Sequence, residues 1–152
     1  MNNGRLPQRK SPRLPAFDYT TPNYYFVTIC TYNKRNLFGM PGQLNELGMI
    51  AEREFGLLSQ RFPDIKIDNY VVMPNHVHAI IVLTDQKSAL PAVVGSYKAH
   101  VTLAIHQQWP VMAVWQRSFH DHVIRDQESY EKIWNYVVHN PNKWSEDCFF
   151  EP

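Results

Sequence analysis

The chain has 152 residues, 44% of them hydrophobic and 13% aromatic, and its formal net charge is +1. This composition excludes an intrinsically disordered chain and fits a single domain with its own core. No apolar run approaches the roughly 20 residues of a membrane helix, and charged residues stand where a signal peptide needs an apolar segment. The widely separated Cys30 and Cys148 argue against a disulfide framework. We therefore expect a cytoplasmic protein.

Positive charge is concentrated at the N-terminus. Arg5, Arg9, Lys10 and Arg13 all precede the first acidic residue, and the rest of the chain has 11 basic against 14 acidic residues. Prolines are scattered through the same stretch, which shows no hydrophobic period. We expect the first 22 residues to form an extended basic arm, which either holds phosphates or only solubilises the terminus.

The first half of the chain contains several β-branched runs and one segment whose apolar residues recur at helical spacing. YYFVTICT is β-branched and aromatic, as strands are, and apolar residues at helical spacing run up to Pro63. A tight Met73-Pro74-Asn75 turn separates two later apolar runs. The predicted elements are a strand (24–31), a loop or short hairpin (33–42), a helix (47–60) and two paired strands (65–72 and 76–83).

The second half predicts two more helices around one strand. Asp126 is an expected N-cap for the last helix, which ends before Pro141. The predicted elements are a polar turn (85–91), a helix (93–108), a strand bent near 117–118 (111–124) and a helix (127–140). The order β-α-β-β-α-β-α resembles a ferredoxin-like split βαβ, an α+β fold with an antiparallel sheet, helices on one face and a C-terminal tyrosine-bearing helix. We expect one domain over residues 23–145 and a short tail over 146–152.

Two histidines open the second strand of the central pair. Because side chains alternate along a strand, His76 and His78 point to the same face, about 7 Å apart along the strand. Such a pair can share one metal ion, or it can be two ordinary polar residues at a sheet edge. The apolar run AIIVL that follows indicates a central strand that is covered on both faces.

The last predicted helix carries a second candidate group. Tyr136 and Asn140 are four residues apart and therefore share one side of the helix. A tyrosine hydroxyl, with a pKa near 10, is a poor nucleophile unless a metal polarises the phosphate under attack. The amide oxygen of Asn140 could join the two imidazoles as a metal ligand. Alternatively, Tyr136 is a core residue and Asn140 only ends the helix.

Three blocks, YFVTICT, YVVMPNHVHAIIVL and VWQRSFHDHVIR…YVVHNP, resemble the REP-associated tyrosine transposases, which are single-tyrosine transposases of the HUH endonuclease superfamily. The resemblance runs from about Ser11 to Trp144, and MPNHVH is its specific part. It implies that His76 and His78 bind Mg²⁺ or Mn²⁺, that Tyr136 is the nucleophile, and that Asn140 lies near the metal. The implied activity is DNA transposition, in which single-stranded DNA beside hairpins is cut and rejoined through a covalent 5′-phosphotyrosine. A bacterial protein that associates with the nucleoid when it acts is expected.

The third metal ligand and the DNA contacts are open. His139 is an alternative to Asn140, and neither brings negative charge, so we expect weak metal binding by the free protein that DNA phosphate strengthens. Trp109, Trp115 and Tyr97 could stack on unpaired bases or pack in the core. The basic candidates for phosphate contacts are Arg9, Lys10, Arg13, Lys98, Arg117 and Arg125.

Two other hypotheses about the function remain beside the transposase. Ferredoxin-like sheets also form non-catalytic domains that bind single-stranded nucleic acid, although the RNP pattern is missing here. A small metal hydrolase with a structural Tyr136 is the other reading. For the transposase we favour a monomer, and a homodimer that exchanges the tyrosine helix is the alternative.

Overall fold

The structure is a computed structural model that describes residues 23–84, 88–141 and 144. The expected basic arm, with Arg9, Lys10 and Arg13, and the expected tail over 146–152 lie outside the described residues. In chain order the elements are β1 (Asn23–Cys30), the 3-10 helix η1 (Tyr32–Lys34), β2 (Gly39–Met40), β3 (Gln43–Leu44), α1 (Glu46–Arg61), β4 (Ile65–Met73), β5 (His76–Leu83), α2 (Leu90–His106), β6 (His120–Ile124) and α3 (Gln127–His139).

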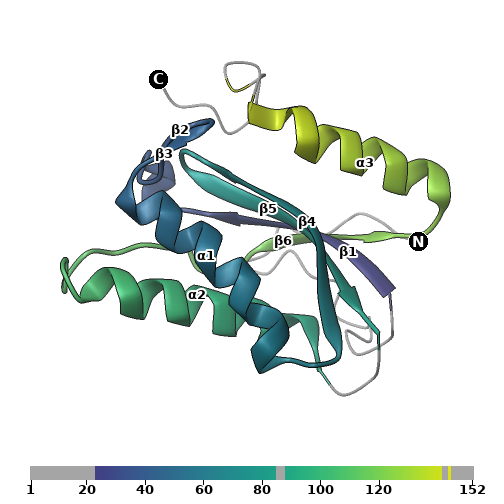
Figure 1. Ribbon diagram of the computed structural model, residues 1–152, viewed down its shortest axis with the longest axis horizontal. Coiled ribbons are helices and arrows are strands. Elements are labelled where there is room, and N and C mark those ends of the chain that lie inside the picture. The colour runs from purple at the N-terminus through teal and green to yellow at the C-terminus, as the bar shows by residue number, and fades with distance from the viewer. Residues whose placement is uncertain (1–22, 85–87, 142–143, 145–152) are drawn as a thin grey trace.

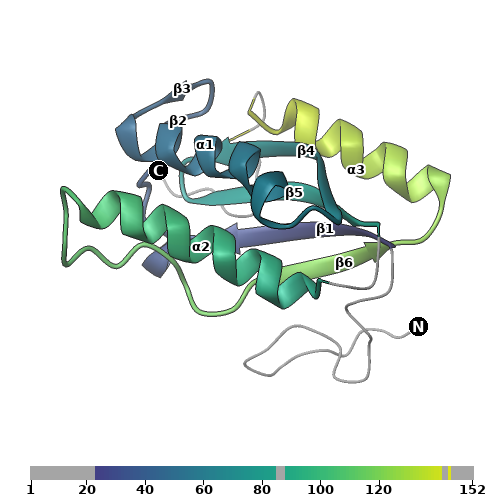
Figure 2. The ribbon, with the colours of Figure 1, turned by 60° about the horizontal axis from the view of Figure 1, so that its bottom comes forward.

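Four strands form one antiparallel sheet in the order β4-β5-β1-β6. Helices α1 and α2 pack against each other and cover one face of this sheet, while α3 lies across the opposite face (Figure 1). The turned view shows the four strands side by side in this order, with α1 and α2 in front of them (Figure 2). The predicted α+β class and the ferredoxin-like arrangement are therefore confirmed.

Alternation along the two central strands divides their side chains between the layers. Tyr25, Val27 and Ile29 of β1 belong to the core under α1 and α2, as do Val77, Ala79 and Ile81 of β5. The intervening residues face α3. The histidines of β5 are among them, and the register places Thr28 opposite His78 and Cys30 opposite His76. The core and the candidate site are thus on opposite sides of the same two strands.

Local capping explains where α1 and α3 begin. The side chain of Asn45 accepts a hydrogen bond from the amide of Gly48 at 2.9 Å, and Asp126 accepts one from Ser129 at 2.8 Å. Gly48 is also required by close approach, because a Cβ there would lie 2.3 Å from the carbonyl oxygen of Phe38. Within the described residues, no helix is long and apolar enough to cross a membrane.

The predicted strand over 111–124 is wrong in its first half. Only His120–Ile124 pairs with β1, and the preceding segment is a loop that has one isolated bridge, between Thr31 and Trp115. Val114 and Phe119 of this segment are buried in the core, so their apolar character imitates a strand. The ammonium of Lys98 holds the loop by donating to the carbonyl oxygens of Gln116 (2.8 Å) and Ser118 (2.9 Å).

Two smaller expectations also need correction. Helix α2 begins at Leu90, inside the predicted polar turn, because Pro91 stands in the first helical turn, where its missing amide hydrogen costs nothing. The sequence of α3 also predicts a broad apolar stripe, formed by Tyr130, Ile133, Trp134, Val137 and Val138. Most of this stripe is not fully buried, since Val137 is buried whereas Val138 is exposed. The helix therefore contacts the sheet along a narrow line.

Candidate active site

The two histidines of β5 converge on one point. His76 is 0% and His78 1% exposed, and their Nε2 atoms are 3.1 Å apart. Both side chains lie on the face of the sheet that α3 crosses. Two buried imidazoles with nitrogen atoms this close need a proton or a cation between them, because two lone pairs facing each other repel.

The outer nitrogen atoms of both rings have hydrogen-bond partners from neighbouring positions. Nδ1 of His76 lies 2.8 Å from Oδ1 of Asn75, whose own amide nitrogen donates to the carbonyl oxygen of Lys34. An amide oxygen only accepts, so His76 donates from Nδ1 and presents the lone pair of Nε2. Nδ1 of His78 lies 2.9 Å from the hydroxyl of Thr28, which can accept in the same way. Metal-binding histidines are typically oriented by such partners.

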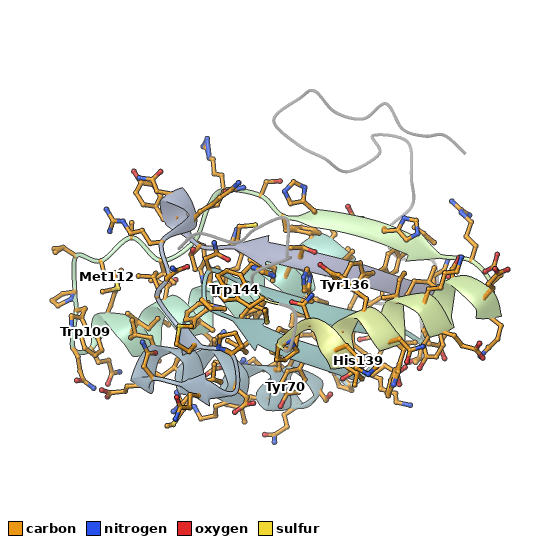
Figure 3. All side chains as sticks on the ribbon, turned by 90° about the horizontal axis from the view of Figure 1, so that it is seen from above. Tyr70, Trp109, Met112, Tyr136, His139 and Trp144 are labelled. Atoms are coloured by element: carbon orange, nitrogen blue, oxygen red, sulfur yellow. The ribbon has the colours of Figure 1, made fainter. Side chains whose placement is uncertain are left out.

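Tyr136 lies directly above this pair. Its ring centroid is 5.3 Å from that of His78 and 6.0 Å from that of Phe26, and Phe26 in turn stacks on His78 at 5.1 Å. The residue is nevertheless 41% exposed. In Figure 3 it stands between α3 and the strands of the sheet. A tyrosine in this place is held by aromatic contacts and can still be reached by a large substrate.

Asn140 and His139 have different environments. Asn140 is 3% exposed, and its Oδ1 is a buried atom without a hydrogen-bond partner. His139 is exposed, and its Nδ1 donates to the carbonyl oxygen of Asn135 in the same helix. A buried acceptor without a donor costs about 1–3 kcal/mol, a cost that a bound cation removes. Of the two candidates for a third ligand, Asn140 is thus the one that has a buried acceptor without a partner.

The donor set differs from that of a high-affinity metal site. Among the described residues, no group of three or more His, Cys, Asp or Glu side chains could hold an ion. Two imidazoles and an amide oxygen supply no negative charge. A divalent cation held here would need further oxygen ligands from water or substrate.

Several residues around the site were not recognised from the sequence. Thr28, Asn75 and Phe26 touch the histidines, and the buried ring of Trp144 lies 6.1 Å from that of His76. Alternation along β1 could have put Phe26 and Thr28 on one face. Only the cross-strand register shows that this face carries His78.

The first half of α3 is attached to the sheet by a second tyrosine. The hydroxyl of Tyr130 donates to a carboxylate oxygen of Asp68, and its ring meets that of Tyr24 edge to face at 5.6 Å. Burial, and after it the hydrogen bond with Asp68, raises the pKa of Tyr130 to about 12. The phenol therefore stays protonated and keeps this bond at neutral pH.

The basic and aromatic residues predicted to contact DNA differ in exposure and in their partners. Arg117 is exposed on the loop before β6, and Arg125 is exposed just after that strand. Lys98 lies on α2, and its ammonium contacts the loop carbonyl groups described above. Tyr97 is a core residue whose hydroxyl donates to Ala51, and Trp109 and Trp115 pack against the core. Base stacking on Tyr97 is therefore excluded by its burial.

Comparisons with known proteins point to one family. The family model described as "Transposase IS200 like" matches residues 21–140. A protein of Haemophilus influenzae, described as uncharacterised, is 34% identical over 97% of this chain and 96% of its own length.

Solved structures share the fold. The structure of a REP-associated tyrosine transposase bound to a REP hairpin matches with a TM-score of 0.68, at 22% identity, over 94% of this chain and 74% of the other. A putative transposase from Deinococcus radiodurans matches with a TM-score of 0.57, at 14% identity, over 91% of this chain and 97% of the other. The resemblance read from the sequence is confirmed: the chain belongs to the IS200-like transposase family.

Proposed function

We propose that this protein is a metal-dependent REP-associated transposase, which cuts and rejoins single-stranded DNA beside hairpins and uses Tyr136 as its nucleophile. The observation that carries the proposal is the position of Tyr136, exposed and 5.3 Å from the ring of one of two converging imidazoles. A structural tyrosine has no need of that neighbour. The hairpin-bound relative supports the choice of DNA substrate.

The side chains that would hold the ion are His76, His78 and Asn140. The converging Nε2 atoms and the buried Oδ1 of Asn140 without a partner fit a divalent cation. Mg²⁺ or Mn²⁺, when bound, supplies positive charge that draws electrons from the oxygen atoms of the scissile phosphate. Thr28 and Asn75 orient the two rings from outside.

The covalent step belongs to Tyr136. Its hydroxyl oxygen attacks the phosphorus in line, the P–O3′ bond breaks, and the leaving 3′ oxygen takes up a proton while the phenolic proton passes to solvent. The products are a 5′-phosphotyrosine and a free 3′-hydroxyl. Attack of another 3′-hydroxyl on the phosphotyrosine reverses the step and joins the strands, which conserves the bond energy without a cofactor.

Trapping a covalent adduct tests the proposal. Purified protein and Mn²⁺ are mixed with hairpin oligonucleotides that carry randomised single-stranded flanks, and the product is resolved on a denaturing gel. We expect an adduct that Tyr136→Phe abolishes and that Tyr32→Phe, a matched change at an equally exposed tyrosine, leaves intact. Cutting without an adduct would indicate a hydrolase, and binding without cutting a non-catalytic domain.

We further propose that one chain suffices for cleavage, in the bacterial cytoplasm and on nucleoid DNA. Helix α3 contacts β4 and β5 of its own chain, which supports a complete site in a monomer. Light scattering on the protein–DNA complex measures the stoichiometry. A catalytically inactive Tyr136→Phe chain that restores activity to a His78→Ala chain would instead demonstrate exchange of the tyrosine helix in a homodimer.

A further inference from the structure

Among the described residues, a pocket lies near the first turn of α3, at one end of the sheet face that this helix crosses. Helix α3 lies mainly on β4 and β5. Near its first turn β1 begins and β6 ends, and Tyr130 of the helix contacts Tyr24 of β1. There Tyr24 is 41% exposed. Tyr24, Ile124, Arg125, Asp126 and Tyr130 line a pocket of about 400 Å³. The proposed function assigns nothing to this pocket.

The pocket has a fixed aromatic wall. The rings of Tyr24 and Tyr130 meet edge to face, with an interplanar angle of 86°. The hydrogen bond from Tyr130 to Asp68 holds the second ring in place. Because Tyr24 is also exposed, its ring can stack on a base, and a wall that is already ordered loses little entropy on binding.

The polar groups at the rim match a nucleotide. The guanidinium of Arg125 can pair with a phosphate, and the carboxylate of Asp126 can accept a hydrogen bond from an exocyclic amino group of a base. Stacking on an aromatic side chain contributes to the binding of unpaired bases of any sequence. The pocket volume accommodates a single base with its sugar.

The distance along α3 between Tyr130 and Tyr136 indicates how far the pocket lies from the proposed nucleophile. Tyr130 precedes Tyr136 by six residues, which is about 9 Å along a helix at 1.5 Å per residue. At about 3.4 Å per stacked nucleotide, and more when the strand is extended, this corresponds to about one to three nucleotides. We propose that the pocket of Tyr24, Tyr130 and Arg125 binds an unpaired nucleobase of the DNA, within about three nucleotides of the phosphate that Tyr136 attacks. The inference depends on the proposed function.

A scan with abasic sites tests the pocket. The probes are oligonucleotides recovered as adducts in the trapping experiment, resynthesised with an abasic site at each flank position in turn. Their affinity is measured by fluorescence anisotropy with Tyr136→Phe protein, in which no cleavage intervenes. We expect one abasic position, within three nucleotides of the cleavage point, to weaken binding about tenfold.

Substitution of Tyr24 assigns that position to the pocket. In the same Tyr136→Phe protein, Tyr24→Ala is expected to weaken binding of the intact probe about tenfold and to abolish the effect of that abasic site, while Tyr24→Phe restores both. Tyr32→Ala is the control, because Tyr32 is also 41% exposed but does not line the pocket. An unchanged abasic profile in Tyr24→Ala would overturn the inference and leave the transposase intact. Failure of every oligonucleotide to form an adduct would overturn the proposed function and this inference with it.

Discussion

The hydroxyl of Tyr130 donates a hydrogen bond to a carboxylate oxygen of Asp68, which joins the first half of α3 to the edge strand β4. The ladder between β4 and β5 shifts register between Ile67 and Asn69, so Asp68 has no partner residue on β5. Its side chain is therefore positioned to meet Tyr130. Val137 is the one buried residue within α3, so few other side chains attach the helix to the sheet. We therefore expect the position of Tyr136 over His78 to depend on a bond that is formed six residues earlier in the helix.

Tyr130→Phe is expected to loosen this attachment. The variant keeps the ring contacts with Tyr24 and Trp134 and loses the hydrogen bond, which lowers the free energy of unfolding by about 0.5–1.5 kcal/mol. We expect slower formation of the adduct at saturating DNA, measured by single-turnover kinetics. Tyr32→Phe serves as the control. A rate equal to that of the parent protein would show that the bond does not position Tyr136.

The same bond predicts a dependence of stability on alkaline pH. The pKa of Tyr130 is raised to about 12 by burial and by Asp68, whereas an unfolded tyrosine has a pKa near 10. The stabilisation is fully present below about pH 10 and is lost as the pH rises toward 12, because the unfolded chain then releases the proton first. Urea unfolding at pH 9 and pH 11 should show a smaller decline for Tyr130→Phe than for the parent. An equal decline would contradict the assignment.

Asn140 and His139 can be separated by metal affinity. We expect Asn140→Ala to weaken Mn²⁺ binding at least about tenfold, because Oδ1 is a buried acceptor without a donor and is one of the three proposed ligands. Stability without metal should change by less than about 1 kcal/mol, since the variant removes an unsatisfied acceptor. His139→Ala is the control, because His139 is exposed and bonded within its own helix. The reverse order in isothermal titration calorimetry would identify His139 as the ligand.

Thr28→Val tests the partner of His78. Valine keeps the shape of threonine but cannot accept the hydrogen bond from Nδ1, so the orientation and tautomer of His78 are no longer specified. Mn²⁺ affinity should fall about tenfold. Thr102→Val on α2, on the other side of the sheet, is the matched control and should bind Mn²⁺ like the parent. Equal affinities in all three proteins would exclude an orienting role for Thr28.

The neutral donor set predicts coupling between metal and DNA. Because His76, His78 and Asn140 bring no negative charge, Mn²⁺ should bind the free protein weakly and bind the protein–DNA complex on the order of tenfold more tightly, once phosphate oxygen atoms complete its ligands. Calorimetry with Tyr136→Phe protein, with and without hairpin DNA, measures both affinities. By reciprocity Mn²⁺ should tighten DNA binding by the same factor. Equal Mn²⁺ affinities would contradict the coupling.

Interactions within one element were readable from the sequence. The alternation of β5 put both histidines on one face, the spacing of four put Tyr136 and Asn140 on one side of α3, and Asp126 identified the helix start. These relationships depend only on the repeat of a strand or a helix and on local hydrogen bonds. The long strand expected before His120 was wrong, because a loop that buries a few apolar side chains, here Val114 and Phe119, has a composition similar to that of a strand.

Only the tertiary structure decided how the elements meet. The register of β1 against β5 placed Thr28 beside His78, the ladder shift in β4 brought Asp68 to Tyr130, and the packing of α3 set Tyr136 above the imidazoles. It also distinguished the buried Asn140 from the exposed His139, which adjacent positions in a sequence cannot do. Such contacts join residues that are far apart in the chain, and their geometry follows from the packing of the whole sheet rather than from any local preference.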